Sequence, residues 1–159
     1  MPPSKKLIPL LNEISSYLNQ LLNALLNEYD ALSTNNIKLI ENIAKEKIIL
    51  MEQLEDLDKE KKILLEKSGL DISSSSIEEF ISKSSSPRAP IMKNIWEKIS
   101  TLTKECEKQN NINGIVIESN KKHTENALSI LQGKQQDTEL YSEKGTSIKT
   151  SNPQTMVRA

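Results

Sequence analysis

The chain has 159 residues, of which 36% are hydrophobic, 27% charged and only 3% aromatic, and its formal net charge is −1. So few aromatic residues, together with only 4 glycines, argue against a sheet protein, which needs aromatic packing and turn glycines. The balanced charge gives no attraction to nucleic acid or to a membrane surface, and no apolar run approaches the roughly 18 residues of a membrane span.

Leucine and isoleucine recur in the first segment at the spacing of helices that pack side by side. They fall alternately four and three positions apart, at Leu7, Leu11, Ile14, Leu18, Leu21 and Leu25. This seam predicts a helix over residues 5–32. Additional leucines beside the seam widen the apolar stripe, which favours a bundle of more than two helices.

The four residues 33–36, Ser-Thr-Asn-Asn, interrupt this pattern. Their side chains compete for backbone hydrogen bonds, so they predict a turn and then a second helix over residues 37–67. Apolar residues recur every seven positions along this second helix, and Gly69 follows it as a terminator. The alternative is one unbroken helix across residues 5–67.

A serine-rich stretch after the second helix predicts a linker over residues 70–89. The linker holds one short helix, because Ser76-Ile77-Glu78-Glu79 fits a capping box in front of an apolar pair. We expect Phe80, in that pair, to pack over the end of the bundle.

A third long helix is predicted over residues 90–131. Its stripe is apolar as far as Cys106, but its middle carries Asn110, Asn113 and Asn120. Buried asparagines can fix helix register at a cost in stability. We expect this polar part to pack poorly against its own bundle and to leave a helix face free. Gly114 would let another backbone approach this face closely.

Residues 133–159 have no apolar period and many polar side chains. Such a segment cannot bury enough surface to offset the entropy of ordering it, so we expect a disordered C-terminal tail. The predicted fold class is all-α, an elongated antiparallel bundle of two or three long helices. Residues 1–132 form the helical domain and residues 133–159 the flexible tail.

The chain offers little for catalysis or metal binding. Its one histidine, His123, and its one cysteine, Cys106, are seventeen residues apart on one predicted helix, about 25 Å of rise, so they do not meet. We expect no enzyme activity, cofactor or metal, and we interpret Cys106 as a small core residue. A single cysteine also suits a reducing cytoplasm. Among the acidic residues Glu28 comes closest to the seam, but Tyr29 is expected to fill the stripe instead.

Three elements occur in order along nearly the whole chain. Residues 25–32 form a helix ending rich in glutamate and leucine, and residues 47–54 a leucine-rich segment that follows a lysine. Residues 110–114 have the pattern N-x-x-N-G, with residues 128–131 ending the same helix as L-x-I-L. Residues 141–145 have the pattern Y-x-x-x-G. In these elements the chain resembles the FlgN-type flagellar export chaperones.

The resemblance implies a cytoplasmic chaperone for hook-associated proteins, which form the junction between the flagellar hook and filament. Such a chaperone would bind their C-terminal amphipathic segments, prevent premature assembly and deliver them to the export gate. The tail tyrosine, Tyr141, would dock at that gate. The implied partner-binding residues are Asn110, Asn113, Gly114, Val116, Ile117, Asn120, Thr124, Leu128, Leu131, Tyr141 and Gly145.

The alternative function is a structural coiled-coil protein, for example a self-assembling rod. A rod would continue leucine and isoleucine through residues 106–124, where this chain has asparagines. The interrupted seam therefore favours a chaperone surface over a rod, and it leaves the oligomeric state open.

Overall fold

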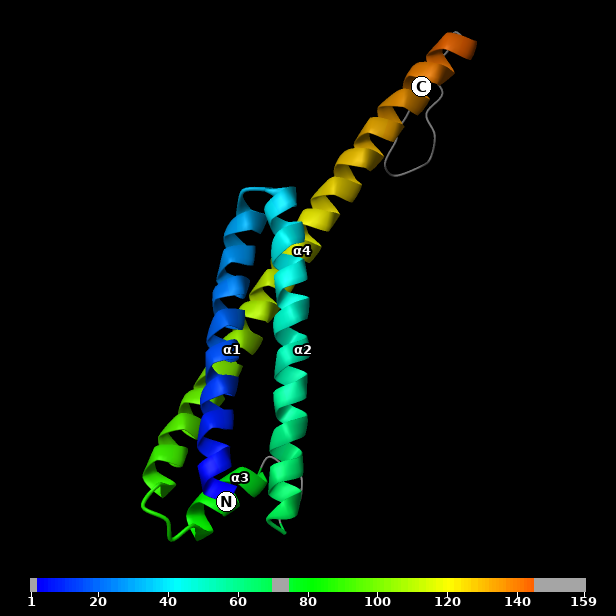
Figure 1. Ribbon diagram of the computed structural model, residues 1–159. Coiled ribbons are helices and arrows are strands. Elements are labelled where there is room, and N and C mark those ends of the chain that lie inside the picture. The colour runs from blue at the N-terminus through cyan, green and yellow to red at the C-terminus, as the bar shows by residue number, and fades with distance from the viewer. Residues whose placement is uncertain (1–2, 70–74, 145–159) are drawn as a thin grey trace. The chain divides into compact units, whose positions relative to one another are not determined.

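A computed structural model describes residues 3–69 and 75–144, and the side chains of residues 5–69 and 77–133 within them. In these ranges the chain forms helices and no strand (Figure 1). The helices are α1 (Pro3–Ser33), α2 (Ile37–Lys67), α3 (Ser75–Lys83) and α4 (Ala89–Lys144). The predicted all-α class is confirmed. The chain divides into two units, Met1–Asn113 and Gly114–Ala159, so α4 contributes to both.

Two asparagines form the turn between α1 and α2, which makes these separate helices rather than one unbroken helix. Asn35 has a left-handed φ of 53°, a conformation that asparagine adopts more readily than most residues. The Asn35 N–H donates to the Leu32 carbonyl and the Asn36 N–H to the Ala31 carbonyl, which is the bond pair of a Schellman motif. Asn36 then caps α2, because its side-chain oxygen accepts a hydrogen bond from the Leu39 N–H at 3.2 Å.

The end of α2 is confirmed at the predicted glycine. Gly69 has a left-handed φ of 78°, and its N–H donates to the Glu66 carbonyl at 2.9 Å. The short helix predicted in the serine-rich linker is α3. Phe80 is partly buried against the core, so its predicted packing at the end of the bundle is confirmed.

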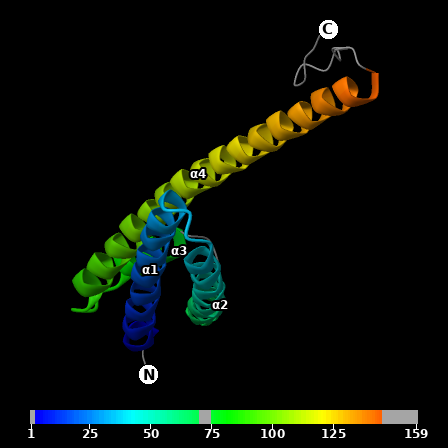
Figure 2. The same ribbon diagram turned by 90° about the horizontal axis from the view of Figure 1, so that it is seen from above.

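The first core cluster joins all four helices inside the first unit. In it, Ile77 and Ile81 of α3 pack in the same buried group as residues of α2 and α4. The helix α3 therefore links those two helices at the end of the bundle where α1 begins (Figure 1, Figure 2). Each fully buried aliphatic side chain stabilises the fold by about 1.5–3 kcal/mol. The cluster consists of Leu7, Leu10, Leu11, Ile14, Leu18, Leu57, Leu65, Ile77, Ile81, Met92, Ile99 and Leu102.

A second core cluster lies nearer the Asn35 turn and contains no residue of α3. Cys106 belongs to it, as predicted, and its thiol donates a hydrogen bond to the Leu18 carbonyl at 3.5 Å. Burial, with a smaller contribution from the Glu105 charge, raises the pKa of the Cys106 thiol. The cluster consists of Leu21, Ala24, Leu25, Ala31, Ile43, Leu50 and Cys106.

The helix α4 continues to Lys144, whereas the sequence predicted an end near Leu131 and a tail from residue 133. Residues 134–144 are rich in lysine, glutamine and glutamate and hold no glycine or proline, so their intrinsic propensity favours helix. The residue directly before them, Gly133, costs only about 1 kcal/mol in a helix interior. The remainder of the predicted tail, residues 145–159, lies outside the described residues. None of the described helices has the length and apolar character needed to cross a membrane.

Candidate partner-binding surfaces

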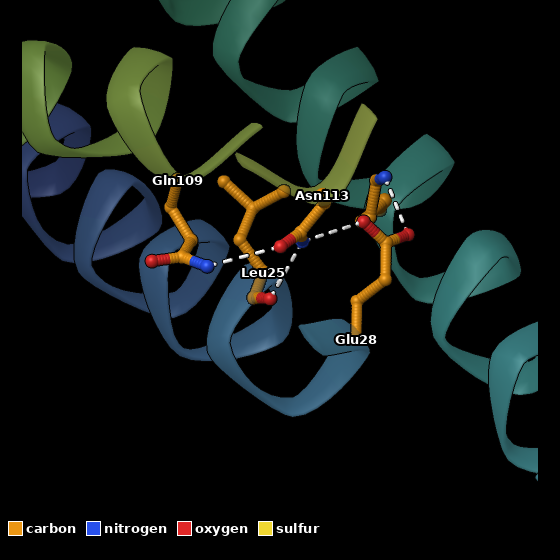
Figure 3. Close-up of polar contacts among 5 residues, drawn as sticks. Leu25, Glu28, Gln109 and Asn113 are labelled. Atoms are coloured by element: carbon orange, nitrogen blue, oxygen red, sulfur yellow. Dashed lines mark hydrogen bonds and ion pairs between the residues drawn. The ribbon is translucent and has the colours of Figure 1, made fainter. Parts of the chain in front are cut away.

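Asn113 was predicted to lie on a free, poorly packed face, but it is only 1% exposed. Its side-chain nitrogen donates to the Leu25 carbonyl and to Glu28 Oε1, both at 2.8 Å (Figure 3). Its side-chain oxygen accepts from Gln109 Nε2 at 2.9 Å. The amide packs well because α1 supplies both acceptors, so Asn113 is not part of a free face of α4.

Glu28, rather than Tyr29, occupies the seam of α1. Glu28 is 5% exposed and Tyr29 is 39% exposed, which corrects the sequence prediction. A buried carboxylate is costly unless it is paired and hydrogen-bonded. Here Lys47 of α2 lies 2.7 Å from Glu28 Oε2 while Asn113 donates to the other oxygen. The sequence shows that Glu28 continues the heptad from Leu25, but it does not show these two distant partners.

Glu28, Lys47 and Asn113 together form a polar network that ties α1, α2 and α4 at one level of the first unit (Figure 3). Because the Glu28 carboxylate has a partner at each oxygen, removing either partner leaves a buried charge incompletely satisfied. We therefore expect the network to favour one register of the three helices over the others that the apolar seams would allow.

Beyond Asn113 the same seam continues along the second unit as a face of α4. Its members are three or four positions apart, the spacing that places side chains in one row on a helix. Ile117, Leu128 and Leu131 on this row are exposed. Between them, the Thr124 hydroxyl donates to the Asn120 carbonyl at 3.0 Å. The row thus has two polar residues between large apolar side chains that are exposed in this unit.

The other predicted partner-binding residues are placed differently. Asn110 is exposed in the first unit, and Val116 is half-buried. A Cβ atom built on Gly114 would meet no atom within 4 Å beyond its own stretch of helix, so no other part of the chain that the structure describes approaches it closely. Tyr141 lies within α4, but its side chain is outside what the structure describes, and Gly145 is outside the described residues.

A second surface, which the sequence analysis missed, is a groove in the first unit with a volume of about 430 Å³. Residues of α1, α2 and α4 line it, and most of them are apolar. Its floor was predicted only as core, because the spacing of a seam does not reveal where neighbouring helices diverge. The lining consists of Leu18, Leu21, Leu25, Lys47, Met51, Leu54, Thr103, Cys106, Glu107 and Asn110.

In the part of the chain that the structure describes, no three His, Cys, Asp or Glu side chains gather as metal ligands would. What the two surfaces can do is cover apolar side chains of another molecule.

The match to a known family extends over most of the chain: the family model for the FlgN protein matches residues 1–148. The chain belongs to the FlgN family. This confirms the resemblance seen in the sequence and places the chain in a family of flagellar export chaperones. No curated protein is similar enough to be counted as a match.

A similar fold occurs in the crystal structure, at 1.48 Å resolution, of a flagella synthesis protein FlgN from Pseudomonas aeruginosa. The two chains superpose with a TM-score of 0.65 and share 22% sequence identity, over 74% of this chain and 90% of that one. At this identity the likeness shows a shared fold.

In this FlgN-family chain, the N-x-x-N-G element lies where the two units meet along α4. Asn113 is the last residue of the first unit and Gly114 the first of the second. The element therefore joins a residue that holds the bundle together to a residue on the exposed segment.

Proposed function

We propose that the chain is a cytoplasmic chaperone that binds hook-associated flagellar proteins, keeps them from assembling prematurely and delivers them to the export gate. The observation that carries the proposal is the uncovered row of Ile117, Leu128 and Leu131 on α4 in a chain of the FlgN family. Apolar side chains exposed in a row are typical of a surface that another protein covers.

The physical mechanism is capture of an amphipathic segment of the client, meaning the exported protein that the chaperone binds. A client helix lays its apolar side chains against the row, as amphipathic helices do in other helix-binding proteins. Asn120 and Thr124 offer polar groups between the apolar contacts. Covering the client's own apolar stripe prevents it from associating with other copies, and this needs no nucleotide.

Delivery to the gate is assigned to Tyr141, which the family's Y-x-x-x-G element singles out. Tyrosine is enriched at the energetic centres of protein interfaces. We expect Tyr141→Ala to reduce the secretion of hook-associated proteins while leaving the circular dichroism spectrum unchanged. Secretion at the rate of the unaltered chain would remove Tyr141 from the proposal.

The test uses a purified hook-associated protein and measures its affinity for the full chain by calorimetry, without nucleotide. Leu128→Glu places a charge on the proposed row, and Ile130→Glu is the matched control. Ile130 is similarly exposed, but its position two residues later points it away from the row. We expect Leu128→Glu to weaken binding about tenfold or more and Ile130→Glu to change it by less than about twofold.

Truncation after Gln132 removes residues 133–159 and keeps the row of Ile117, Leu128 and Leu131. Binding that persists in this variant supports the row as the contact, whereas a complete loss places the contact in the removed residues. If the unaltered chain binds no hook-associated protein, the proposed function is wrong.

A further inference from the structure

The groove in the first unit has a length and a lining that suit one more short helix. Its floor is the row Leu18, Leu21 and Leu25 of α1, which spans about two helical turns at 1.5 Å rise per residue. Met51 and Leu54 of α2 form one wall. The other wall comes from α4 and is formed by Thr103, Cys106, Glu107 and Asn110.

At each end of the groove, α2 and α4 are connected through a third helix. At one end α3 packs into the same buried cluster as both helices. At the other end Lys47 of α2 and Asn113 of α4 both bind the Glu28 carboxylate. Between these ends, the second cluster receives no residue from α3, so none of the helices that the structure describes fills the space between the two walls.

The helix α3 is an example of a short helix that packs against the apolar side chains of this bundle. It is a helix of 9 residues that presents Ile77, Phe80 and Ile81 to the first cluster. The apolar surface is continuous from that cluster to the groove, because Leu22 and Leu54 pack against both core clusters. A second short helix with the same i, i+3, i+4 spacing would extend this packing along α1.

We propose that this groove is a second client-binding site, which takes about two turns of an amphipathic helix bearing apolar residues at i, i+3 or i+4 spacing and basic residues beside them. This inference rests on the proposed chaperone function. The groove is separate from the α4 row, and Met51 and Leu54 are its accessible contacts on α2.

The basic flanks follow from the charges around the groove. Lys47 is already paired with Glu28 at 2.7 Å. Glu107 lines the groove, and Glu52 and Glu55 line an adjoining hollow that shares Met51 with it. These three carboxylates have no ion pair among the described residues. Lysine or arginine on the incoming helix would therefore meet a complementary rim.

The size of the groove favours a client segment over a second copy of this chain. A contact of about two helical turns falls well short of the roughly 800 Å² per partner that a stable interface between folded proteins buries. A contact of this size gives modest affinity, which suits a client that must later be released at the gate.

The experiment compares Met51→Lys with Ile49→Lys in the full chain, by calorimetry with the same purified hook-associated protein. Met51 is 49% exposed and lines the groove, whereas Ile49 is 59% exposed on the same helix and lines no part of it. Because both side chains are half-exposed, neither change is expected to lower the melting temperature appreciably, and circular dichroism checks this. We expect Met51→Lys to weaken binding about tenfold and Ile49→Lys to change it by less than about twofold.

A charge reversal gives an independent readout. Glu107→Lys should weaken binding most at low salt and less at high salt, because the contact with the basic flanks is electrostatic.

Equal affinities for Met51→Lys and Ile49→Lys overturn the groove site. If Leu128→Glu still weakens binding in that case, the chaperone function stands. If the unaltered chain binds no client, both proposals fall. A dimer in sedimentation that Met51→Lys dissociates would identify a second copy as the occupant and overturn the client assignment.

Discussion

Asn113 Nδ2 lies 2.8 Å from Glu28 Oε1, a hydrogen bond that joins positions 85 residues apart in the chain. The bond connects the last residue of the bundle portion of α4 to a carboxylate of α1 that is itself paired with Lys47 of α2. It lies at the boundary between the two units along α4. The element N-x-x-N-G thus has a structural role at Asn113, distinct from the contact role proposed for the residues that follow.

Asn113→Ala should lower the free energy of unfolding by about 1–3 kcal/mol, because the Leu25 carbonyl and one Glu28 oxygen lose their partner. Urea unfolding followed by circular dichroism measures the change. Asn110→Ala is the control, since Asn110 is exposed on the same helix, and it should shift stability by less than about 0.5 kcal/mol. Equal losses in the two variants would contradict a stabilising role for the network.

Replacement of Gly69 and of Gly114 by alanine should change the stability of the chain in opposite directions. Gly69→Ala should destabilise the chain by about 1–2 kcal/mol, because Gly69 has a φ of 78°, which strains any residue with a Cβ. Gly114→Ala should stabilise it by up to about 1 kcal/mol, since Gly114 is helical and an added Cβ meets no atom within 4 Å. Thermal unfolding of both variants tests the two predictions. A loss of stability in Gly114→Ala would refute the prediction for Gly114.

Gly114→Ala also bears on function. If a client backbone approaches α4 closely at this glycine, the alanine variant should be more stable and yet bind the client more weakly. Unchanged affinity would show that no close approach occurs there.

The carboxyl of Asp58 should make a small, pH-dependent contribution to stability. Burial alone would raise its pKa, but hydrogen bonds and charges from Lys61 and Lys62 outweigh burial and lower the pKa below its usual 3.8. The unfolded chain then binds more protons at acid pH, so this stability is present above pH 3.8 and is lost as pH falls through the folded pKa.

Because the Asp58 side chain is 42% exposed, screening should keep the effect below about 1 kcal/mol. Asp58→Asn should remove it, so the stabilities of variant and parent, measured by urea unfolding, should converge as the pH falls through the folded pKa of Asp58. A constant difference from pH 7 down to pH 2 would show that the effect is not one of charge.

Cys106 should react slowly with iodoacetamide in the folded chain. Burial first, and then the nearby Glu105 charge, raise the pKa of its thiol, so less of the reactive thiolate is present at neutral pH. We expect alkylation to be about tenfold or more slower than in chain unfolded by urea, because reaction requires local opening. Equal rates with and without urea would show that the thiol is not shielded by the core.

Much of the fold could be predicted because it depends on neighbouring residues. The seam spacing of α1 and α2 specifies helix, Asn35 and Asn36 close one helix and cap the next, and Gly69 stops α2. Each of these signals acts within one or two turns of chain, so it is visible in the order of residues. The sequence misplaces the end of α4, because Gly133 suggests a stop whereas the helix formers after it continue the helix to Lys144.

The sequence by itself determined that this chain is helical, where α1 and α2 begin and end, that a short helix follows α2, and which family the chain belongs to. Only the tertiary structure decided that Glu28 is buried in place of Tyr29, that Asn113 holds the bundle, and that α2 and α4 leave a groove above α1. These features depend on partners contributed by helices that are distant in the chain. The residues that packing brings opposite a seam decide whether a polar side chain on it finds hydrogen-bond partners. They also decide whether a leucine on it is covered.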